Sequence, residues 1–289
     1  MEIGFIGLGR MGGAMARNLQ DSGHTLYVND VRRSACDDVV AAGGTFRATP
    51  AEIARNADAV LISVPGPDQV DAVLDGDDGL LAGLTDGKLV IDATTIAPDH
   101  SMENARRCAE RGADYIDAPV SGGQHGAISR DLAAMVGADA AAFERARPIL
   151  ECIAKSITHV GPIGSGSTIK LLNQLIFVSY QLVFAEGLAI GEDLGLDLET
   201  MLQVWGASAA GHPEITVKYD EIRGVSDKAG FVVKNALLFF DLADRAQDKL
   251  GYSTPVFDAA GESLRRAMAS GLAGEDMIRA RARYRSPPI

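Results

Sequence analysis

The stretch "EIGFIGLGRMG", residues 2–12, contains the pattern that decides the fold. A short apolar run leads directly into Gly7, Gly9 and Gly12, which have the G-x-G-x-x-G spacing, and a helical pattern follows that stops at Gly23. Glycines in this setting let the chain turn tightly and let backbone N–H groups approach a ligand at the N-terminus of the helix. The motif is weak by itself, but its required context, a strand before and a helix after, is present. A merely structural glycine turn is the alternative.

Short apolar runs alternate with longer helical patterns in the first part of the chain. After the opening strand these runs are "TLYVN", "AVLISV", "KLVIDA", "DYIDA", "LAAMV" and "ITHV". Such alternation is typical of βαβ units around a mainly parallel sheet. Beyond "GPIGSGS" the strand signals stop, and helices are predicted near residues 167–194, 197–208, 231–250, 254–271 and 275–283. We therefore predict an α/β Rossmann-type N-terminal domain over residues 1–162 and an all-α C-terminal domain over residues 163–289.

Composition and charge exclude several classes of partner. With 289 residues, 47% of them hydrophobic, the chain is long enough for one or two domains with real cores. A formal net charge of −12 would repel nucleic acid or an anionic membrane surface, so neither is expected as a partner. Three scattered cysteines indicate neither a disulfide framework nor a metal site. The N-terminus lacks an export pattern, and the most apolar stretch, residues 171–190, contains several polar residues, so a cytoplasmic protein is predicted.

The second apolar run ends in Asn29 and Asp30. An acidic side chain at this place can accept hydrogen bonds from the adenosine ribose hydroxyls of a dinucleotide. Contacts with a dinucleotide are therefore predicted for Gly7, Leu8, Gly9, Arg10, Met11, Gly12, Asn29 and Asp30. The Asp30 carboxylate would repel the 2′-phosphate of NADP, whereas Arg32 and Arg33 would attract it. We favour NAD as the cofactor, with NADP possible.

Two further loops follow strands at the end where ligands bind in open α/β sheets. They are "SVPGP", residues 63–67, and "DATTIAP", residues 92–98. Their positions predict cofactor contacts from Val64, Pro65 and Thr95. The prolines as turn residues, and Thr95 as a helix cap, are the alternatives.

The loop "DAPVSGG", residues 117–123, predicts an anion site. Ser121 offers a hydroxyl, and Gly122 and Gly123 offer unhindered backbone N–H groups, which together suit a carboxylate. Ser-Gly-Gly is also common turn chemistry, so a plain turn remains open.

"GSGSTIKLLNQLIF", residues 164–177, runs from a small-residue loop into an apolar helix. Lys170, Asn173 and Gln174 stand at i, i+3 and i+4, so they share one face of that helix. The predicted domain boundary lies just before them, and small-molecule sites form preferentially at such junctions. By spacing alone, Lys170 reaching to solvent beside a buried helix is the alternative.

The motifs "GFIGLGRMG", "DATTIAP", "DAPVSGG" and "GPIGSGSTIKLLNQ", in this order and at these separations, resemble the β-hydroxyacid dehydrogenases. That is the family of 3-hydroxyisobutyrate dehydrogenase and tartronate semialdehyde reductase, and the resemblance covers essentially the whole chain. It implies a long helix leading into the all-α domain, a homodimer or homotetramer, and a small carboxylate-bearing substrate. It also implies that Lys170 is the catalytic residue and that Asn173 positions the substrate.

This chain departs from the family pattern at several positions. Gln174 stands where the family usually has a second asparagine, and Arg130 with Asp131 replaces a usual Gly-Thr. Counting back from Pro255, the lysine that the family places near the cofactor is Phe240 here. We keep Gln174 as a predicted substrate contact and Phe240 as a predicted cofactor contact.

The leading hypothesis from the sequence is an oxidoreductase that transfers a hydride between NAD(P) and a small 3-hydroxy acid or the corresponding semialdehyde. An enzyme like the imine reductases, which share this architecture, is one alternative, although they generally lack the lysine at position 170. A dinucleotide-binding scaffold without catalysis is another, for which Phe240 is the main argument.

Overall fold

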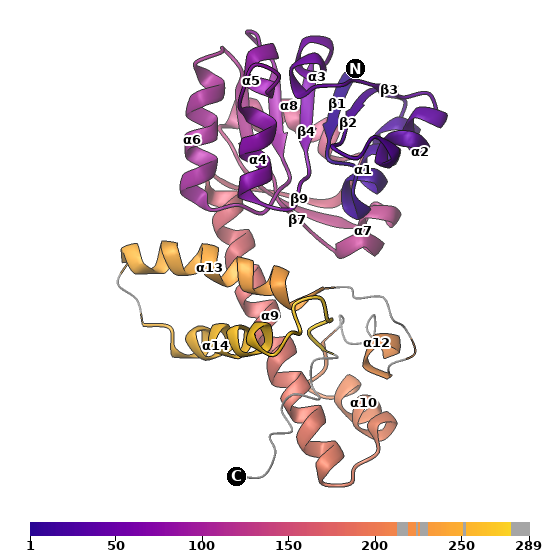
Figure 1. The fold of residues 1–289 in the computed structure, drawn as a ribbon, viewed down its shortest axis with the longest axis vertical. Coiled ribbons are helices and arrows are strands. Elements are labelled where there is room, and N and C mark those ends of the chain that lie inside the picture. The colour runs from indigo at the N-terminus through magenta and orange to yellow at the C-terminus, as the bar shows by residue number, and fades with distance from the viewer. Residues whose placement is uncertain (213–218, 224, 226–230, 251–252, 279–289) are drawn as a thin grey trace. The chain divides into compact units, whose positions relative to one another are not determined.

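The first part of the chain folds around a nine-stranded sheet whose larger portion is parallel. This computed structural model describes residues 1–212, 219–223, 225, 231–250 and 253–278. The strand order is β3-β2-β1-β4-β5-β6-β8-β7, with β9 paired to β8, and Figure 1 shows the helices packed around the sheet. The first six strands in this order run parallel, as the alternation of strands and helices predicts. The predicted Rossmann-type fold is confirmed.

The strands are short, with four to six residues in most of them. Their bounds are β1 Glu2–Ile6, β2 Thr25–Asn29, β3 Thr45–Phe46, β4 Ala59–Ile62, β5 Leu89–Asp92, β6 Asp114–Asp117, β7 Val120–Ser121, β8 Leu132–Gly137 and β9 Ala154–Gly161. The seven predicted runs all lie on strands, while the two-residue strands β3 and β7 carry no periodic signal that would have revealed them. Strand β8 pairs antiparallel with β6 and β7 and parallel with β9.

The helices of this part pack on both faces of the sheet. They are α1 Arg10–Asp21, η1 Arg33–Cys36, α2 Asp37–Ala41, α3 Pro50–Asn56, α4 Pro67–Leu74, α5 Leu80–Gly83, α6 Pro98–Ala109, α7 Gly123–Ser129 and α8 Ala140–Leu150. One hydrophobic core joins α1, α2, α7 and α8 to the sheet, and the other joins α3, α4, α5 and α6 to the opposite face. Figure 1 shows α4, α5 and α6 side by side on their face.

Alternation along the strands explains the two cores. In β4, Leu61 belongs to one core while Val60 and Ile62 belong to the other. Successive side chains of a strand point to opposite faces, so a strand covered by helices on both sides must be apolar throughout. All four residues of β4 are buried, which accounts for the unbroken run "AVLI".

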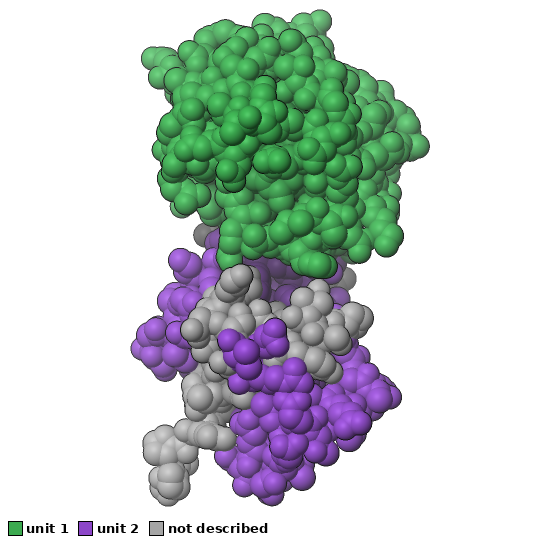
Figure 2. Space-filling model, turned by 90° about the vertical axis from the view of Figure 1, so that its right-hand side faces the viewer, with its two compact units in different colours: residues 1–171 green, residues 172–289 purple. Residues whose placement is uncertain are grey.

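The chain forms two compact units, Met1–Leu171 and Leu172–Ile289, coloured green and purple in Figure 2. The predicted domain boundary after residue 162 lies just before helix α9, Ser165–Asp193, which begins in the first unit and continues into the second. The first turn of α9 therefore belongs with the sheet.

The second unit is helical, as predicted. Its helices after α9 are α10 Leu198–Gly206, α12 Tyr219–Arg223, α13 Val233–Leu250 and α14 Pro255–Ala269. The helix predicted over residues 275–283 is wrong for residues 275–278, which form turns and a bridge between Val232 and Asp276. Residues 279–283 lie outside the described part of the chain. The Asp276 carboxylate accepts hydrogen bonds from the N–H groups of Phe231 and Ile278, which stabilise the turn in place of a helix.

Helix α9 is long and apolar enough, by length and composition, to cross a membrane, and 56% of its most apolar window is buried inside the protein. Its side chains Leu175, Val178 and Leu182 belong to the hydrophobic core of the second unit. A core helix of a soluble protein passes the same composition test, so this feature is weak evidence for a membrane span.

Phe240 lies in that same core and is 1% exposed. A Cβ placed on Gly261 of α14 would approach its ring to 3.3 Å, which shows how closely α13 and α14 pack there. This packing supports a structural role for Phe240. Its contact with a cofactor stays a prediction from the family resemblance.

Candidate active site

The glycine loop between β1 and α1 has one face packed and one face open. Gly7 has φ +91°, and a Cβ there would lie 2.3 Å from the carbonyl oxygen of Ser63. A Cβ on Gly12 would lie 1.9 Å from the carbonyl oxygen of Gly7. A Cβ on Gly9, in contrast, would meet nothing within 4 Å. The protein needs two of the glycines for its own packing, whereas Gly9 leaves open space that suits a pyrophosphate at the start of α1.

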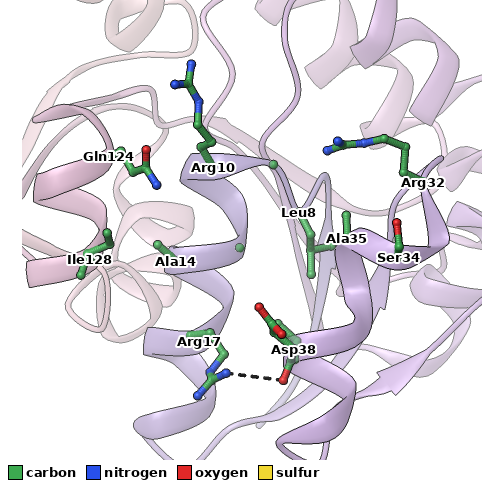
Figure 3. Close-up of a pocket in the computed structure, with 13 residues that line it drawn as sticks. Leu8, Arg10, Ala14, Arg17, Arg32, Ser34, Ala35, Asp38, Gln124 and Ile128 are labelled. Carbon is green, nitrogen blue, oxygen red and sulfur yellow. Dashed lines mark hydrogen bonds between the residues drawn. The ribbon is translucent and has the colours of Figure 1, made fainter. Parts of the chain in front are cut away.

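A pocket of about 560 Å³ lies beside this loop (Figure 3). Leu8, Gly9 and Arg10 line it from the loop and the start of α1, in agreement with three of the predicted contacts. Arg17 and Arg32 add two further guanidinium groups to its lining. Asp38 also lines the pocket, and Arg32 pairs with Asp30 at 3.8 Å. Three arginines against these two carboxylates leave a local excess of positive charge in a protein of net charge −12, which suits an anionic ligand.

Asp30 is held against the glycine loop. Its carboxylate accepts hydrogen bonds from the N–H groups of Leu8 and Arg32, both at 2.8 Å. A carboxylate has room for further donors, such as the ribose hydroxyls expected from the sequence. Asp30 therefore fixes the loop as well as offering an acceptor, which the sequence did not reveal.

The two arginines that the sequence grouped together point to different surroundings. Arg32 lines the pocket, whereas Arg33 pairs with Asp37 at 2.7 Å and lies 4.3 Å from the ring centre of Phe46. Arg33 is therefore engaged in its own contacts on η1 and α2. The nearby Asn29 is buried, and its side-chain amide donates to the carbonyl oxygens of Arg47 and Ala48 rather than lining the pocket.

The predicted loops all leave one edge of the sheet. The pairing register places Asn29, Ile6, Ile62, Asp92 and Asp117 in a single row across five parallel strands. Each of these residues is the last of its strand. The glycine loop, the loops after β2, β4 and β5, and the segment that leads to Ser121 begin directly after this row, so the sheet brings them to a common edge.

The loops after β4 and β5 are tied together by a buried network. Asp92 accepts hydrogen bonds from the N–H of Thr94 and the hydroxyl of Tyr115, both at 2.8 Å, and burial raises the pKa of Asp92 to about 6. The N–H of Val64 donates to the hydroxyl of Thr94 at 3.2 Å. The neighbouring Thr95 is half-buried and Pro65 is exposed, so both remain accessible for the predicted cofactor contact.

The Ser-Gly-Gly loop is open to solvent. Gly122 has φ +127° and Gly123 has φ +60°, which is the left-handed region that disfavours other residues. A Cβ on Gly123 would meet nothing within 4 Å, while one on Gly122 would approach Leu132 to 3.1 Å. Ser121, the last residue of β7, is half-buried. The backbone conformation thus explains both glycines, and the open side of Gly123 suits the predicted carboxylate.

Lys170 is buried, with 5% of its surface exposed. Burial lowers the pKa of its ammonium group to about 8, because removal from water penalises the charged form. Lysines rarely occur in such surroundings without a function. An amine with this pKa can both accept and donate a proton close to neutral pH.

Asn173 and Gln174 follow Lys170 on α9. The Asn173 amide donates to the side-chain oxygen of Gln174 at 3.2 Å, and Gln174 is buried. The two amides thus orient each other. Their contact with a substrate stays a prediction.

Asp117 is a residue to which the sequence analysis assigned no role. It is buried, and its two carboxylate oxygens accept hydrogen bonds from the N–H groups of Gly164 (2.8 Å) and Ser167 (2.6 Å) at the start of α9. The sequence feature that could have revealed Asp117 was an acidic residue at the end of a strand, at the start of the motif that contains Ser121.

Among the described residues no group of three or more His, Cys, Asp or Glu side chains forms a metal site.

Comparison with known proteins agrees with this geometry. The family model of the NAD binding domain of 6-phosphogluconate dehydrogenase matches residues 2–161. The model described as NAD-binding of NADP-dependent 3-hydroxyisobutyrate dehydrogenase matches residues 164–283. The fold and the open glycine loop, with these models, define the class of the protein as a dehydrogenase that uses NAD(P).

Relatives of known activity match over almost their full length. The NAD-dependent L-serine dehydrogenase of Pseudomonas aeruginosa is 35% identical, with 95% of both chains covered. The 2-(hydroxymethyl)glutarate dehydrogenase of Eubacterium barkeri is 34% identical over 96% of this chain and 92% of its own. The solved 3-hydroxyisobutyrate dehydrogenase of Salmonella typhimurium has a TM-score of 0.90 at 26% identity, covering 98% of this chain and 99% of that one. The chain belongs to the β-hydroxyacid dehydrogenase family.

Proposed function

We propose that this protein oxidises a small 3-hydroxy acid, or reduces the corresponding semialdehyde, with Lys170 as the group that moves the proton. The observation that carries the proposal is the buried Lys170 amine, whose pKa is lowered to about 8, on a helix whose first turn is anchored at the ligand-bearing edge of the sheet. Structural lysines are found at the surface, where their pKa stays near the usual value of about 10.4.

The named activities of the relatives support this substrate class. L-serine, 2-(hydroxymethyl)glutarate and 3-hydroxyisobutyrate each carry a hydroxymethyl group next to the carbon that bears a carboxylate. They differ in the other substituent of that carbon. We therefore propose a substrate with this common core and leave the identity of the substituent to experiment.

In the proposed reaction Lys170 transfers the proton, and the other site residues bind the substrate. The bound nicotinamide supplies the hydride acceptor or donor. Lys170 takes the proton of the substrate hydroxyl in the oxidation and returns it in the reduction. Ser121 and the backbone N–H groups of Gly122 and Gly123 hold the carboxylate, and Asn173 with Gln174 orients the hydroxyl end. Such two-point holding of a substrate contributes a large part of the rate of an enzyme.

A panel of 3-hydroxy acids that differ in the second substituent tests the proposal directly. We expect at least one of them to increase the absorbance of the reduced nicotinamide in the presence of NAD or NADP. The matching semialdehyde should reverse the change. If no member of the panel reacts with either cofactor, the proposed function is wrong.

Imine reduction is the second candidate. A Streptomyces aurantiacus imine reductase has a TM-score of 0.67 at 21% identity over 99% of this chain and 100% of that one, which is a likeness of fold alone. The presence of Lys170 argues against this activity, because the imine reductases generally lack the lysine at this position. Cyclic imines included in the panel would reveal the activity by consumption of the reduced cofactor.

We propose that NAD is preferred over NADP because the Asp30 carboxylate lies at the end of β2, next to the pocket. Asp30→Asn removes the charge but keeps an oxygen that accepts the N–H of Leu8 or Arg32. Loss of like-charge repulsion should raise kcat/KM with NADP relative to NAD by about tenfold, or about 1.4 kcal/mol. A wild-type protein that already prefers NADP would show that Arg10, Arg17 and Arg32 outweigh Asp30. Asp58→Asn serves as the control, because it makes the same change of charge at an exposed position just before β4, at the opposite end of the strands.

We also propose that the protein is a homodimer or homotetramer that works in the cytoplasm. Leu172, Ile176, Val183 and Ile190 form an apolar stripe on one side of α9, and each is at least 44% exposed. Their spacings of four and seven residues keep them within about 40° of one another around the helix. A stripe of this kind suits packing against the same stripe of a second copy. Bacterial relatives of the dehydrogenase family support the cytoplasmic assignment.

The oligomer can be tested by light scattering. Ile176→Asp combined with Val183→Asp should yield a monomer, because two charges on the stripe would have to be buried in the interface. Gln203→Asp, at an exposed position of α10, should leave the mass unchanged. A monomeric wild-type protein would contradict the proposal.

A further inference from the structure

We propose that Asp117 is a positioning residue that holds Lys170 at a set place relative to the Ser-Gly-Gly loop. The inference rests on the proposed function, because it assigns to Asp117 an effect that is exerted through Lys170. It concerns only residues of the first compact unit, in which both ends of the proposed connection lie.

The hydrogen bonds of Asp117 join two segments that are far apart in the sequence. Its Oδ1 accepts from the N–H of Gly164, 47 residues away, and its Oδ2 accepts from the N–H of Ser167, 50 residues away. Both donors belong to the start of α9, whose first N–H groups have no partner within the helix. A carboxylate that accepts two such N–H groups makes charge-assisted hydrogen bonds, and its negative charge also matches the helix dipole.

Two glycines, Gly166 and Gly137, allow the start of α9 to approach Asp117 closely. A Cβ on Gly166 would lie 2.3 Å from the carbonyl oxygen of Met135 and 2.7 Å from that of Asp117. A Cβ on Gly137, the partner of Asp117 in β8, would lie 2.3 Å from Oδ1 of Asp117. The backbone of α9 thus rests directly on β6 and β8, and only glycine fits at either contact.

A second contact fixes the same turn of the helix. The hydroxyl of Ser167 lies 2.9 Å from the hydroxyl of Ser101 on α6, and both side chains are fully buried. Ser167 precedes Lys170 by three residues, so the two lie on neighbouring positions of one helix face. The backbone that carries Lys170 is therefore fixed one turn before the lysine itself.

The same residue begins the loop that we propose to hold the substrate carboxylate. Asp117 is the last residue of β6, and Ser121 to Gly123 follow within six residues. The side chain of Asp117 holds the lysine helix while its backbone leads to the carboxylate site. Asp117 therefore sets the distance between the Lys170 amine and the hydroxyl of a substrate whose carboxylate is held at the Ser-Gly-Gly loop. A displacement of about 1 Å in such a distance can lower a rate a hundredfold.

Asp117→Asn tests the inference through a double-mutant cycle with Lys170→Ala. Asn keeps the shape of the side chain but accepts from only one of the two N–H groups. We expect kcat to fall at least about tenfold while the affinity for the reduced cofactor, measured by fluorescence titration, stays within about twofold. In the Lys170→Ala background the same substitution should change kcat by less than about twofold, because a positioning residue has nothing left to position.

Asp114→Asn is the matched control, since Asp114 lies at the start of the same strand, has a half-buried side chain, and pairs with Arg145. It should leave kcat unchanged. If Asp117→Asn does not fold, Gly166→Ala takes its place in the cycle, because it retains the carboxylate and both N–H donors but forces the helix away from Met135. The same non-additive loss is then expected.

The outcomes separate this inference from the proposed function. If Lys170→Ala keeps its kcat, the proposed function is wrong and the inference falls with it. If Lys170→Ala loses its kcat but Asp117→Asn keeps it, or the two losses multiply in the double variant, only the positioning role is wrong.

Discussion

Lys170→Ala lowers kcat by at least about a hundredfold while the affinity for NAD(P) changes little, if the amine moves the substrate proton. The magnitude is that of general acid–base catalysis by a positioned side chain. Steady-state kinetics measure kcat, and fluorescence titration of the reduced cofactor measures binding. A variant with near-normal turnover would contradict the assignment. Lys170→Arg should not restore activity, since a guanidinium group does not release its proton in this pH range.

The same residue sets the expected pH dependence. The pKa of Lys170 is lowered to about 8 by burial. Below that pH the ammonium form predominates and cannot accept a proton, so kcat of the oxidation should rise as the pH increases through about 8. The reduction requires the protonated form, so its kcat should fall over the same interval. A profile for the oxidation that is flat between pH 7 and 9 would show that another group moves the proton.

The second large effect concerns the carboxylate of the substrate. An acid should exceed its neutral amide in kcat/KM by about 2 to 4 kcal/mol, or about 30- to 900-fold, which is the range for a set of charge-assisted hydrogen bonds left unmade. The reason is that the Ser121 hydroxyl and the N–H groups of Gly122 and Gly123 would have no charged partner. Equal turnover of acids and uncharged alcohols by the wild-type protein would contradict both the carboxylate site and the hydroxy-acid function.

Gly123→Val should remove most of this preference without changing cofactor binding. Apart from its own neighbours in the chain, none of the residues that the structure describes comes within 4 Å of the added Cβ, so the side chain would extend into the open space in which the ligand is proposed to bind. The substitution also strains a backbone with φ +60°. Gly87→Val is the matched control, because Gly87 has φ +79° and equally open surroundings but lies before β5, at the opposite end of the strand. The control should show a similar loss of stability and an unchanged preference for the acid.

Hydrophobic patterns in the sequence were sufficient to predict those strands and helices whose formation depends on residues close together in the chain. The period of the apolar residues predicted the parallel strands other than β3, and four of the helices in the second unit, because alternation and helical spacing reflect which side of an element is buried. The helix predicted at 275–283 fails over its described residues because Asp276 uses its carboxylate to bind backbone N–H groups of a turn. Side chains that compete with the backbone in this way are not visible in a hydrophobic pattern.

Some residues of the candidate site could likewise be predicted from the sequence, and others could not. Gly7, Gly9 and Gly12 could be predicted because their spacing follows from one turn between a strand and a helix. Asp117 could not, since it reaches the start of α9 through contacts with residues 47 and 50 positions away in the chain. Arg17 could have been found, because it stands seven residues after Arg10 on α1 and therefore shares a helix face with it. The separation of Arg32 from its neighbour Arg33 depends on where Asp37 and Phe46 happen to lie. No spacing rule contains that information.

The sequence by itself determined the class of fold and the dinucleotide motif, because each is encoded within one or two adjacent elements. It also made Lys170 the candidate for catalysis, through the resemblance of four separate motifs to the β-hydroxyacid dehydrogenases. Only the tertiary structure decided that Lys170 is buried with a lowered pKa, and that the row of strand ends from Asn29 to Asp117 brings the loops to one edge. The physical reason is that desolvation and hydrogen bonding across about 50 residues depend on which segments meet in space. The hydrogen bonds between Asp117 and the start of α9 are of this kind.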